Sequence, residues 1–190
     1  MFVDESLWIR VALERANLNA GMTVLDIGSS TRAFRTVTQP HIDGNVFEPL
    51  RQRGISPIHL DARAEPGVDI VADVTSLEGV DRCFDVVLCT NLLEHVVDRA
   101  ATLQNVKRVV APRGLLLLTV PRRYRLHQDP IDTGFRPSAD ELSQLVGWPE
   151  VLEREVVTVR AHQHYRGRRL LRRWLWPWQI ACLLVRKPPE

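Results

Sequence analysis

The chain has 190 residues, 45% of them hydrophobic, and a formal net charge of +2. This length suits one domain with a sizeable core. No apolar run approaches about 18 residues, the length that spans a bilayer. The small net charge argues against a dedicated nucleic-acid-binding protein. The start of the chain shows no basic-then-apolar leader, and the three cysteines have no metal-ligand spacing. We therefore expect a cytoplasmic protein with reduced thiols.

Short apolar segments alternate with helical patterns along the chain. An amphipathic helix is expected over 6–16, with Leu7 and Val11 facing inward and Ile9 and Leu13 as further candidates for that face. Between 31 and 54 two prolines interrupt any long helix. Further helices are expected over 100–110 and after Ser138, which forms a capping-box pattern with Glu141. Strands are expected over 23–27, 55–60, 68–74, 84–89, 115–120, 151–159 and 179–186.

This alternation predicts an α/β fold in which an open parallel sheet is buried by helices. There is no internal repeat and no clear linker, so we expect residues 1–190 to form a single domain. The segment 162–178 is expected to be an insertion before the last strand.

Polar residues follow several of the predicted strands at the edge where α/β sheets bind ligands. Gly28 ends the first strand and allows a close backbone approach to a ligand. Asp61 follows the second strand, and an acid at that position accepts hydrogen bonds from ribose hydroxyls. Asp73 follows the third strand and is placed to accept from an adenine amino group. Asn91 follows the fourth.

Four segments in this order resemble the motifs of class I S-adenosylmethionine (SAM)-dependent methyltransferases of the type 11 family: 24–30, 69–74, 84–96 and 108–121. The resemblance covers roughly residues 20–121. It implies a Rossmann-like, mostly parallel seven-stranded sheet with helices on both faces, and SAM as the cofactor. The cofactor-binding residues it implies are Asp26, Gly28, Ser29, Ser30, Asp61, Asp73 and Asn91.

The first motif departs from the family pattern at two positions. Ser30 stands where a second glycine is usual, and Arg32 stands where a third is common. These departures motivate a rival hypothesis, a catalytically inactive methyltransferase fold that acts as a binding or scaffold protein. The absence of G-x-G-x-x-G disfavours a dinucleotide oxidoreductase.

Two acids compete for the ribose. Glu48 lies 22 residues after Asp26, whereas Asp61 ends a better strand. We favour Asp61, with a surface role for both acids as the remaining alternative.

Glu94-His95 also has two interpretations. Some quinone-pathway members of the family hold a metal with a Glu/His cluster, but here Asn91 replaces its upstream acid. Neighbouring residues on a helix point to different faces, so we expect a packing role for the pair and no metal site.

The loop 121–137 follows the strand that faces the transferable methyl group in this fold. Tyr124, His127 and Asp129 are therefore the predicted acceptor-side catalytic residues, with His127 as a base toward a hydroxyl. The alternative is that His127 and Asp129 only tie the loop together. Arg136 is expected to pair with Asp132, Asp129 or an anionic acceptor. The loop also resembles loops of polysaccharide-cluster methyltransferases. We therefore expect O-methylation of a small-molecule or glycan acceptor. The basic, tryptophan-rich segment 166–178 suggests that this acceptor is lipid-linked.

Residues 166–178 interleave arginine with leucine and tryptophan. This composition is typical of peripheral membrane contact, at the inner face of the membrane for a cytoplasmic protein. The favoured alternative is that the tryptophans pack on the domain or on a second subunit in a homodimer. Nucleic acid is the least expected partner. His162 and His164 are expected on the surface.

Overall fold

The computed structural model describes residues 1–127, 131–164 and 174–189. Seven strands form one sheet in the order β3-β2-β1-β4-β5-β7-β6. Strands β1 to β5 run parallel, and β7 runs antiparallel to both β5 and β6. This confirms the expected Rossmann-like sheet. The strands are β1 (Val24–Ile27), β2 (Pro57–Asp61), β3 (Ile70–Val71), β4 (Phe84–Thr90), β5 (Val110–Arg123), β6 (Glu150–Thr158) and β7 (Gln179–Arg186).

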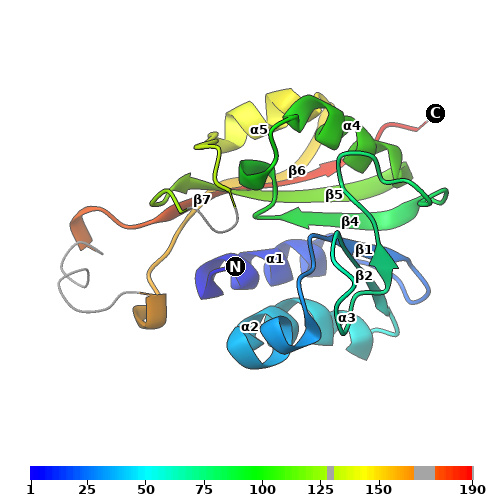
Figure 1. Cartoon of the computed structure of the whole chain (residues 1–190), viewed down its shortest axis with the longest axis horizontal. Helices are drawn as coiled ribbons and strands as arrows, with labels where there is room; N and C mark the ends of the chain where they lie inside the picture. Colours follow the sequence, from blue (N-terminus) through cyan, green and yellow to red (C-terminus); the bar gives the residue numbers. More distant parts are fainter. Residues whose placement is uncertain (128–130, 165–173, 190) are drawn as a thin grey trace.

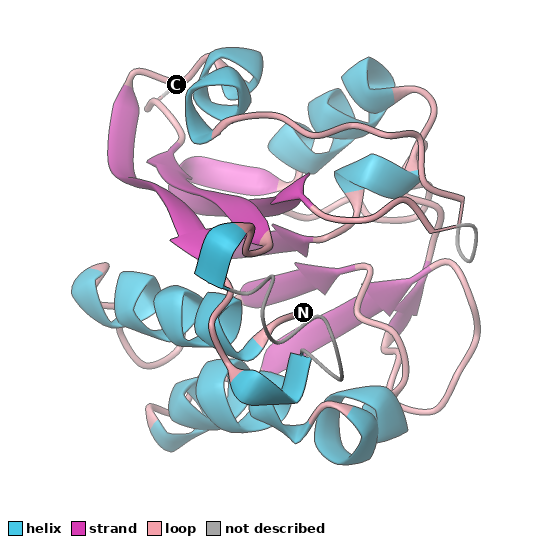
Figure 2. Ribbon diagram, turned by 90° about the vertical axis from the view of Figure 1, so that its left-hand side faces the viewer, coloured by secondary structure: helices cyan, strands magenta, loops and turns pink. Residues whose placement is uncertain are grey.

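Helices cover both faces of the sheet (Figures 1 and 2). One face carries α1 (Val3–Arg15), α2 (Pro40–Ile42) and α3 (Glu48–Gln52), and the other carries α4 (Arg99–Arg108) and α5 (Ala139–Val146). Two separate apolar clusters fill the layers between the helices and the sheet. The short helical segments η1 (Phe34–Thr38), η2 (Asp43–Phe47), η3 (Leu93–His95) and η4 (His162–His164) connect these elements.

The buried face of α1 differs from the expected one. Leu7 and Val11 are 45% and 42% exposed, so the prediction that they face inward was wrong. The face toward the sheet carries Ile9 and Leu13, and also Glu5, which is fully buried. Ile9 and Leu13 were further candidates for the inward face and are confirmed there, whereas the buried Glu5 was not expected because its burial depends on hydrogen bonds.

Two local predictions are confirmed, and a third is corrected. Ser138 caps α5: its hydroxyl accepts from Glu141 N at 3.1 Å, and the Glu141 carboxylate accepts from Ser138 N at 2.7 Å. The last strand has the predicted bounds. The strand β3 is shorter than expected, with only Ile70 and Val71 paired to β2.

Within the described part of the chain, no helix is long and apolar enough to cross a membrane.

Candidate functional site

A cavity of about 930 Å³ opens at the carboxyl ends of β1, β2, β4 and β5. Ligands bind at this edge in open α/β sheets because the connections diverge there. Met1 and Phe2 from the start of the chain complete its wall, together with His164 and Trp178. Residues far apart in sequence therefore share one chamber.

The turn after β1 brings backbone directly to the cavity. Gly28 has φ +76°, and a Cβ there would lie 3.2 Å from Leu92 Cδ1. The amides of Gly28 and Ser29 both donate to Leu60 O, at 2.8 and 3.0 Å. Ser30 adopts φ +58°, a left-handed conformation that a serine adopts only at a cost. The turn thus keeps the shape that glycine gives it in the family pattern.

Asp61 anchors this turn. Its carboxylate ends β2, lines the cavity, and accepts from Ser30 N at 2.8 Å. Asp26 also lines the cavity, is 4% exposed, and lies 3.0 Å from His59 Nδ1. Both acids are fixed by neighbours before any ligand arrives.

The two other predicted acids lie elsewhere. Glu48 is exposed on α3, where hydrogen bonds from Arg51 lower its pKa. Asp73 is exposed after β3 and accepts from the backbone and hydroxyl of Thr75, which lower its pKa. Neither lines the cavity. Adenine contact by Asp73 stays a prediction.

Two arginines, Arg32 and Arg35, follow the turn after β1 without blocking the cavity. Arg32 is exposed and is not part of the cavity wall; its backbone amide donates to Pro66 O at 2.8 Å. Arg35 is 3% exposed, and its guanidinium donates to the carbonyls of Ser29 and Gly67 at 2.9 and 2.8 Å. Burial lowers the pKa of Arg35, and the nearby Asp26 carboxylate opposes this shift. The arginine joins the β1 turn to the loop before β3.

A buried glutamate fixes the end of β4. Asn91 lines the cavity with φ +49°, and its side-chain amide donates to Glu5 Oε1 at 2.6 Å. The same oxygen accepts from Thr119 Oγ1 at 2.6 Å, and Glu5 Oε2 accepts from Phe2 N at 2.9 Å. Helix α1 is therefore tied to β4 and β5 through one carboxylate.

Glu94 and His95 lie together in the cavity wall. Glu94 is 1% exposed, and its Oε2 has no hydrogen-bond partner among the described residues. Its Oε1 lies 3.6 Å from His95 Nε2. The expectation that the two side chains diverge was wrong, because η3 is a 3₁₀ turn. Burial raises the Glu94 pKa to about 8, and the Glu5 carboxylate adds to the rise.

The predicted acceptor loop contributes two of its three residues. Tyr124 and His127 line the cavity, whereas Asp129 lies outside the described residues. Arg136 pairs with Asp132, 3.0 Å from Nη1 to Oδ1, which was one of the expected pairings. Although burial opposes the shift, hydrogen bonds from Arg136 and Gly134 lower the Asp132 pKa to about 2.

Aromatic rings form the outer wall. Tyr124 contacts Phe2 and Trp178 edge to face, with ring centroids 5.4 and 4.9 Å apart. His164 Nε2 accepts from Val3 N at 2.9 Å and its ring lies 4.9 Å from Phe2. His164 is half-buried in the wall, so its predicted surface position was wrong; the side chain of His162 is outside the described residues.

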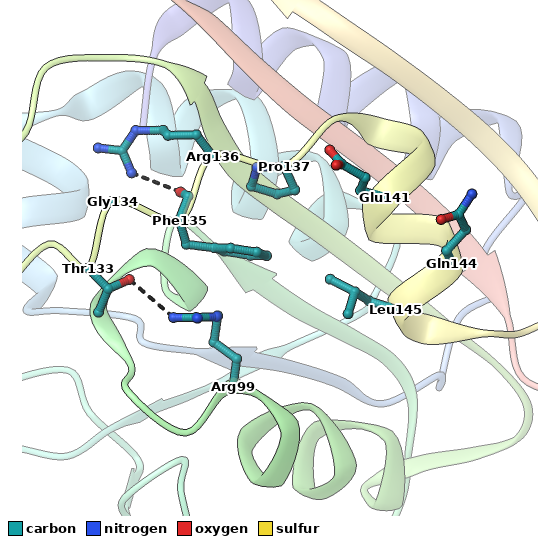
Figure 3. A pocket seen from close by; sticks show the side chains of 9 residues that line it. All are labelled: Arg99, Thr133, Gly134, Phe135, Arg136, Pro137, Glu141, Gln144 and Leu145. Atoms are coloured by element: carbon teal, nitrogen blue, oxygen red, sulfur yellow. Dashed lines mark hydrogen bonds between the residues drawn. The ribbon is translucent and has the colours of Figure 1, made fainter.

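A second cavity of about 620 Å³ lies between α4, α5 and the loop 133–137 (Figure 3). Arg99 lies 4.7 Å over the Phe135 ring and donates to Thr133 Oγ1 at 3.3 Å. This hollow has no strand end in its wall, and these polar groups bond to one another. The first cavity is therefore the candidate site.

Sequence reasoning gave no site role to Phe2, Arg35, His164 and Trp178, which line the cavity, or to Glu5, which holds Asn91. Arg35 follows shortly after the first motif, whereas the others lie on segments remote from the motifs, and no spacing signal connects them. No group of three or more His, Cys, Asp or Glu in the described ranges is arranged to hold a metal.

The model of a family described as a methyltransferase domain matches residues 5–178. A demethylmenaquinone methyltransferase of Paenarthrobacter aurescens is 27% identical over 112 residues, 58% of this chain and 43% of the relative. A ubiquinone biosynthesis O-methyltransferase of Xanthomonas oryzae pv. oryzae is 30% identical over 113 residues, 55% and 45% of the two chains. The chain thus spans about half the length of these curated relatives.

A solved structure has the same fold. The N-methyltransferase NodS of Bradyrhizobium japonicum, in complex with S-adenosylhomocysteine (SAH), has a TM-score of 0.55 at 15% identity. The match covers 97% of this chain and 86% of NodS.

Proposed function

The chain belongs to the class I SAM-dependent methyltransferase family, and on that premise we propose that it transfers a methyl group from SAM to a hydroxyl of a small-molecule or glycan acceptor. One observation carries the proposal. A single cavity joins the backbone turn at Gly28 and the carboxylate of Asp61 to a second half lined by protonable and aromatic side chains.

The turn and the acids fit SAM. A Cβ at Gly28 would fill space at the cavity wall, which is the mark of a backbone that approaches a ligand. Asp61 offers carboxylate oxygens where a ribose is expected, and Ser29 and Ser30 border the same space. Ser30 and Arg32, which motivate the scaffold hypothesis, leave the cavity open.

When bound, SAM supplies an electrophilic methyl group. The task left to the chain is mainly positioning, since displacement at a methyl carbon depends on alignment. Asn91, held by Glu5, borders the junction of the two halves. Phe2, Tyr124 and Trp178 contact one another in the wall of the same cavity.

Transfer to oxygen is supported by the acceptor half, where Glu94, His95 and His127 are proton acceptors within one wall. The Xanthomonas relative is named as an O-methyltransferase. To test the assignment, methyl-labelled SAM is incubated with the protein and phenolic, saccharide and amine acceptors. We expect label in a methyl ether. Label confined to N-methyl or C-methyl products would contradict it.

We also propose that the end of the 166–178 segment contacts a membrane surface. Trp174, Leu175 and Trp176 are 72%, 83% and 64% exposed, whereas Trp178 packs in the cavity wall. Exposed aromatic residues beside arginines favour the interface. In flotation with phosphatidylglycerol vesicles, the wild type should float and a Trp174→Ala/Trp176→Ala variant should not. Val97→Ala, another exposed apolar residue, is the control; equal flotation of all three proteins rules the contact out.

A further inference from the structure

Glu94 is the most unusual polar group in the site. Its side chain is 2% exposed, yet it carries a carboxylate oxygen without a partner in the described structure. A buried polar atom left unsatisfied costs free energy, so such groups need an explanation. Because Glu94 borders the cavity beside His95, a ligand hydroxyl is a suitable partner for Oε2.

His95 has the tautomer that suits this pairing. Its Nδ1 lies 2.9 Å from Ile131 O, and a carbonyl only accepts, so Nδ1 carries the hydrogen. Burial lowers the His95 pKa, which favours the neutral ring. Nε2 therefore presents a lone pair toward Glu94 Oε1, 3.6 Å away.

The chamber beside this pair suits an aromatic ring. From His95 the rings continue to His127 at 5.1 Å and from His127 to Tyr124 at 5.9 Å, and Phe2 and Trp178 surround Tyr124. Aromatic rings favour edge-to-face contacts at such centroid distances. This half of the cavity thus has aromatic side chains at one end and the Glu94 carboxyl group at the other.

We propose that Glu94 is the catalytic residue that receives the acceptor's proton, and that the acceptor is a phenol whose ring lies against Phe2, Tyr124 and Trp178. The proposal rests on the proposed function. The phenol oxygen forms the bond to the methyl carbon as the carbon–sulfur bond breaks. The electron pair of that bond stays on sulfur, and the hydroxyl proton passes to Glu94 Oε2. A carboxylate, a phenol and a sulfonium thus give a carboxylic acid, a methyl ether and a thioether.

The acidities of the two groups agree with this choice. A phenol such as tyrosine has a pKa of about 10, and water has one of about 15.7. The raised pKa of Glu94, about 8, lies much nearer to the first, so transfer of a proton to Glu94 is less uphill from a phenol than from water. An alkyl or sugar hydroxyl is a poorer match. The ionisable groups near Glu94 on neighbouring elements are Glu5, Cys89, His95, Asp132 and Arg136.

Calorimetry on the SAH-loaded protein tests the contact without turnover. Catechol carries the hydroxyls, 1,2-dimethoxybenzene lacks them, and methyl glucoside stands for a glycan. We expect the wild type to bind catechol at least about tenfold more tightly than the dimethoxy compound. Glu94→Gln should lose that discrimination and keep its SAH affinity. Equal discrimination by both proteins overturns the role of Glu94, and preferential binding of methyl glucoside overturns the phenol.

Infrared spectra recorded across a pH titration test whether Glu94 takes up and releases a proton. The wild type should show a carboxylic acid band that disappears with a midpoint near pH 8 and is absent from Glu94→Gln. A Glu94 that is ionised throughout pH 5–9 overturns the proposal. If the wild type binds no SAH, the proposed function itself fails, which is a separate result.

Discussion

The two halves of the cavity are built by different means. Around β1 and β2 the shape comes from backbone: left-handed turn residues, amides donating to Leu60 O, and Asp61 holding Ser30 N. Around β4 and β5 it comes from side chains: Glu94 and Tyr124 follow these strands directly, and Phe2 and Trp178 come from distant segments. A backbone cradle suits a ligand shared by a whole family, whereas a side-chain chamber suits a ligand particular to one member.

The largest effect is expected where backbone meets ligand. Gly28→Arg should lower SAH affinity by about 1000-fold, because the added side chain occupies the cradle and φ is positive. Gly79 has the same φ of +76° with open space around it. Gly79→Arg shares the backbone strain and should bind SAH within threefold of the wild type, roughly. Calorimetric titration with SAH measures both affinities. Equal losses of SAH affinity in the two variants would contradict the placement of the site.

In the acceptor half, Glu94 should make the folding stability of the protein depend on pH. The folded-state pKa of Glu94 lies above its ordinary value of about 4.5, so the native state holds a proton that the unfolded state releases. Stability is therefore lost as pH rises from 4.5 through 8. Glu94→Gln should match the wild type at pH 5 and exceed it by about 3 kcal/mol at pH 9 in denaturant unfolding. A constant difference across this range would contradict a buried, protonated Glu94.

Asp132 should show the opposite dependence. Its folded-state pKa is depressed to about 2, so its contribution is present above its ordinary pKa of about 4 and is lost as pH falls to 2. Asp132→Asn should lower the melting temperature by a few degrees at pH 7 and by little at pH 2. A pH-independent loss would mean that Arg136 does not stabilise the carboxylate.

The smallest change in SAH affinity is expected from the variants that distinguish the two candidate ribose acids, Asp61 and Glu48. Asp61→Asn should weaken SAH binding by about tenfold, since one charged acceptor is lost while the turn keeps a partner for Ser30 N. Glu48→Gln changes an exposed carboxylate outside the cavity and should have no effect. A larger loss of SAH affinity in Glu48→Gln than in Asp61→Asn would assign the ribose to Glu48.

The same contrast explains what the sequence could predict. The cradle follows from one rule, that polar residues after parallel strands meet at one edge, and Gly28, Asp61 and Asn91 all lie there. The same rule placed Tyr124 and His127 in the acceptor half, but it could not predict the residues that reach this half from distant segments. Glu5 meets Thr119 across 114 residues, and Phe2 meets Trp178 from the other end of the chain. Apolar periodicity favoured Leu7 and Val11 over Ile9 and Leu13, because it does not register that the face of Ile9 and Leu13 also buries a hydrogen-bonded glutamate.

The central claim is that this cavity binds SAM, and isothermal titration of the wild type with SAM and SAH tests it most directly. We predict micromolar binding of both, which the open cavity beside Ser30 and Arg32 permits. Absence of binding by either compound would contradict the account, and would leave a methyltransferase fold that serves as a scaffold.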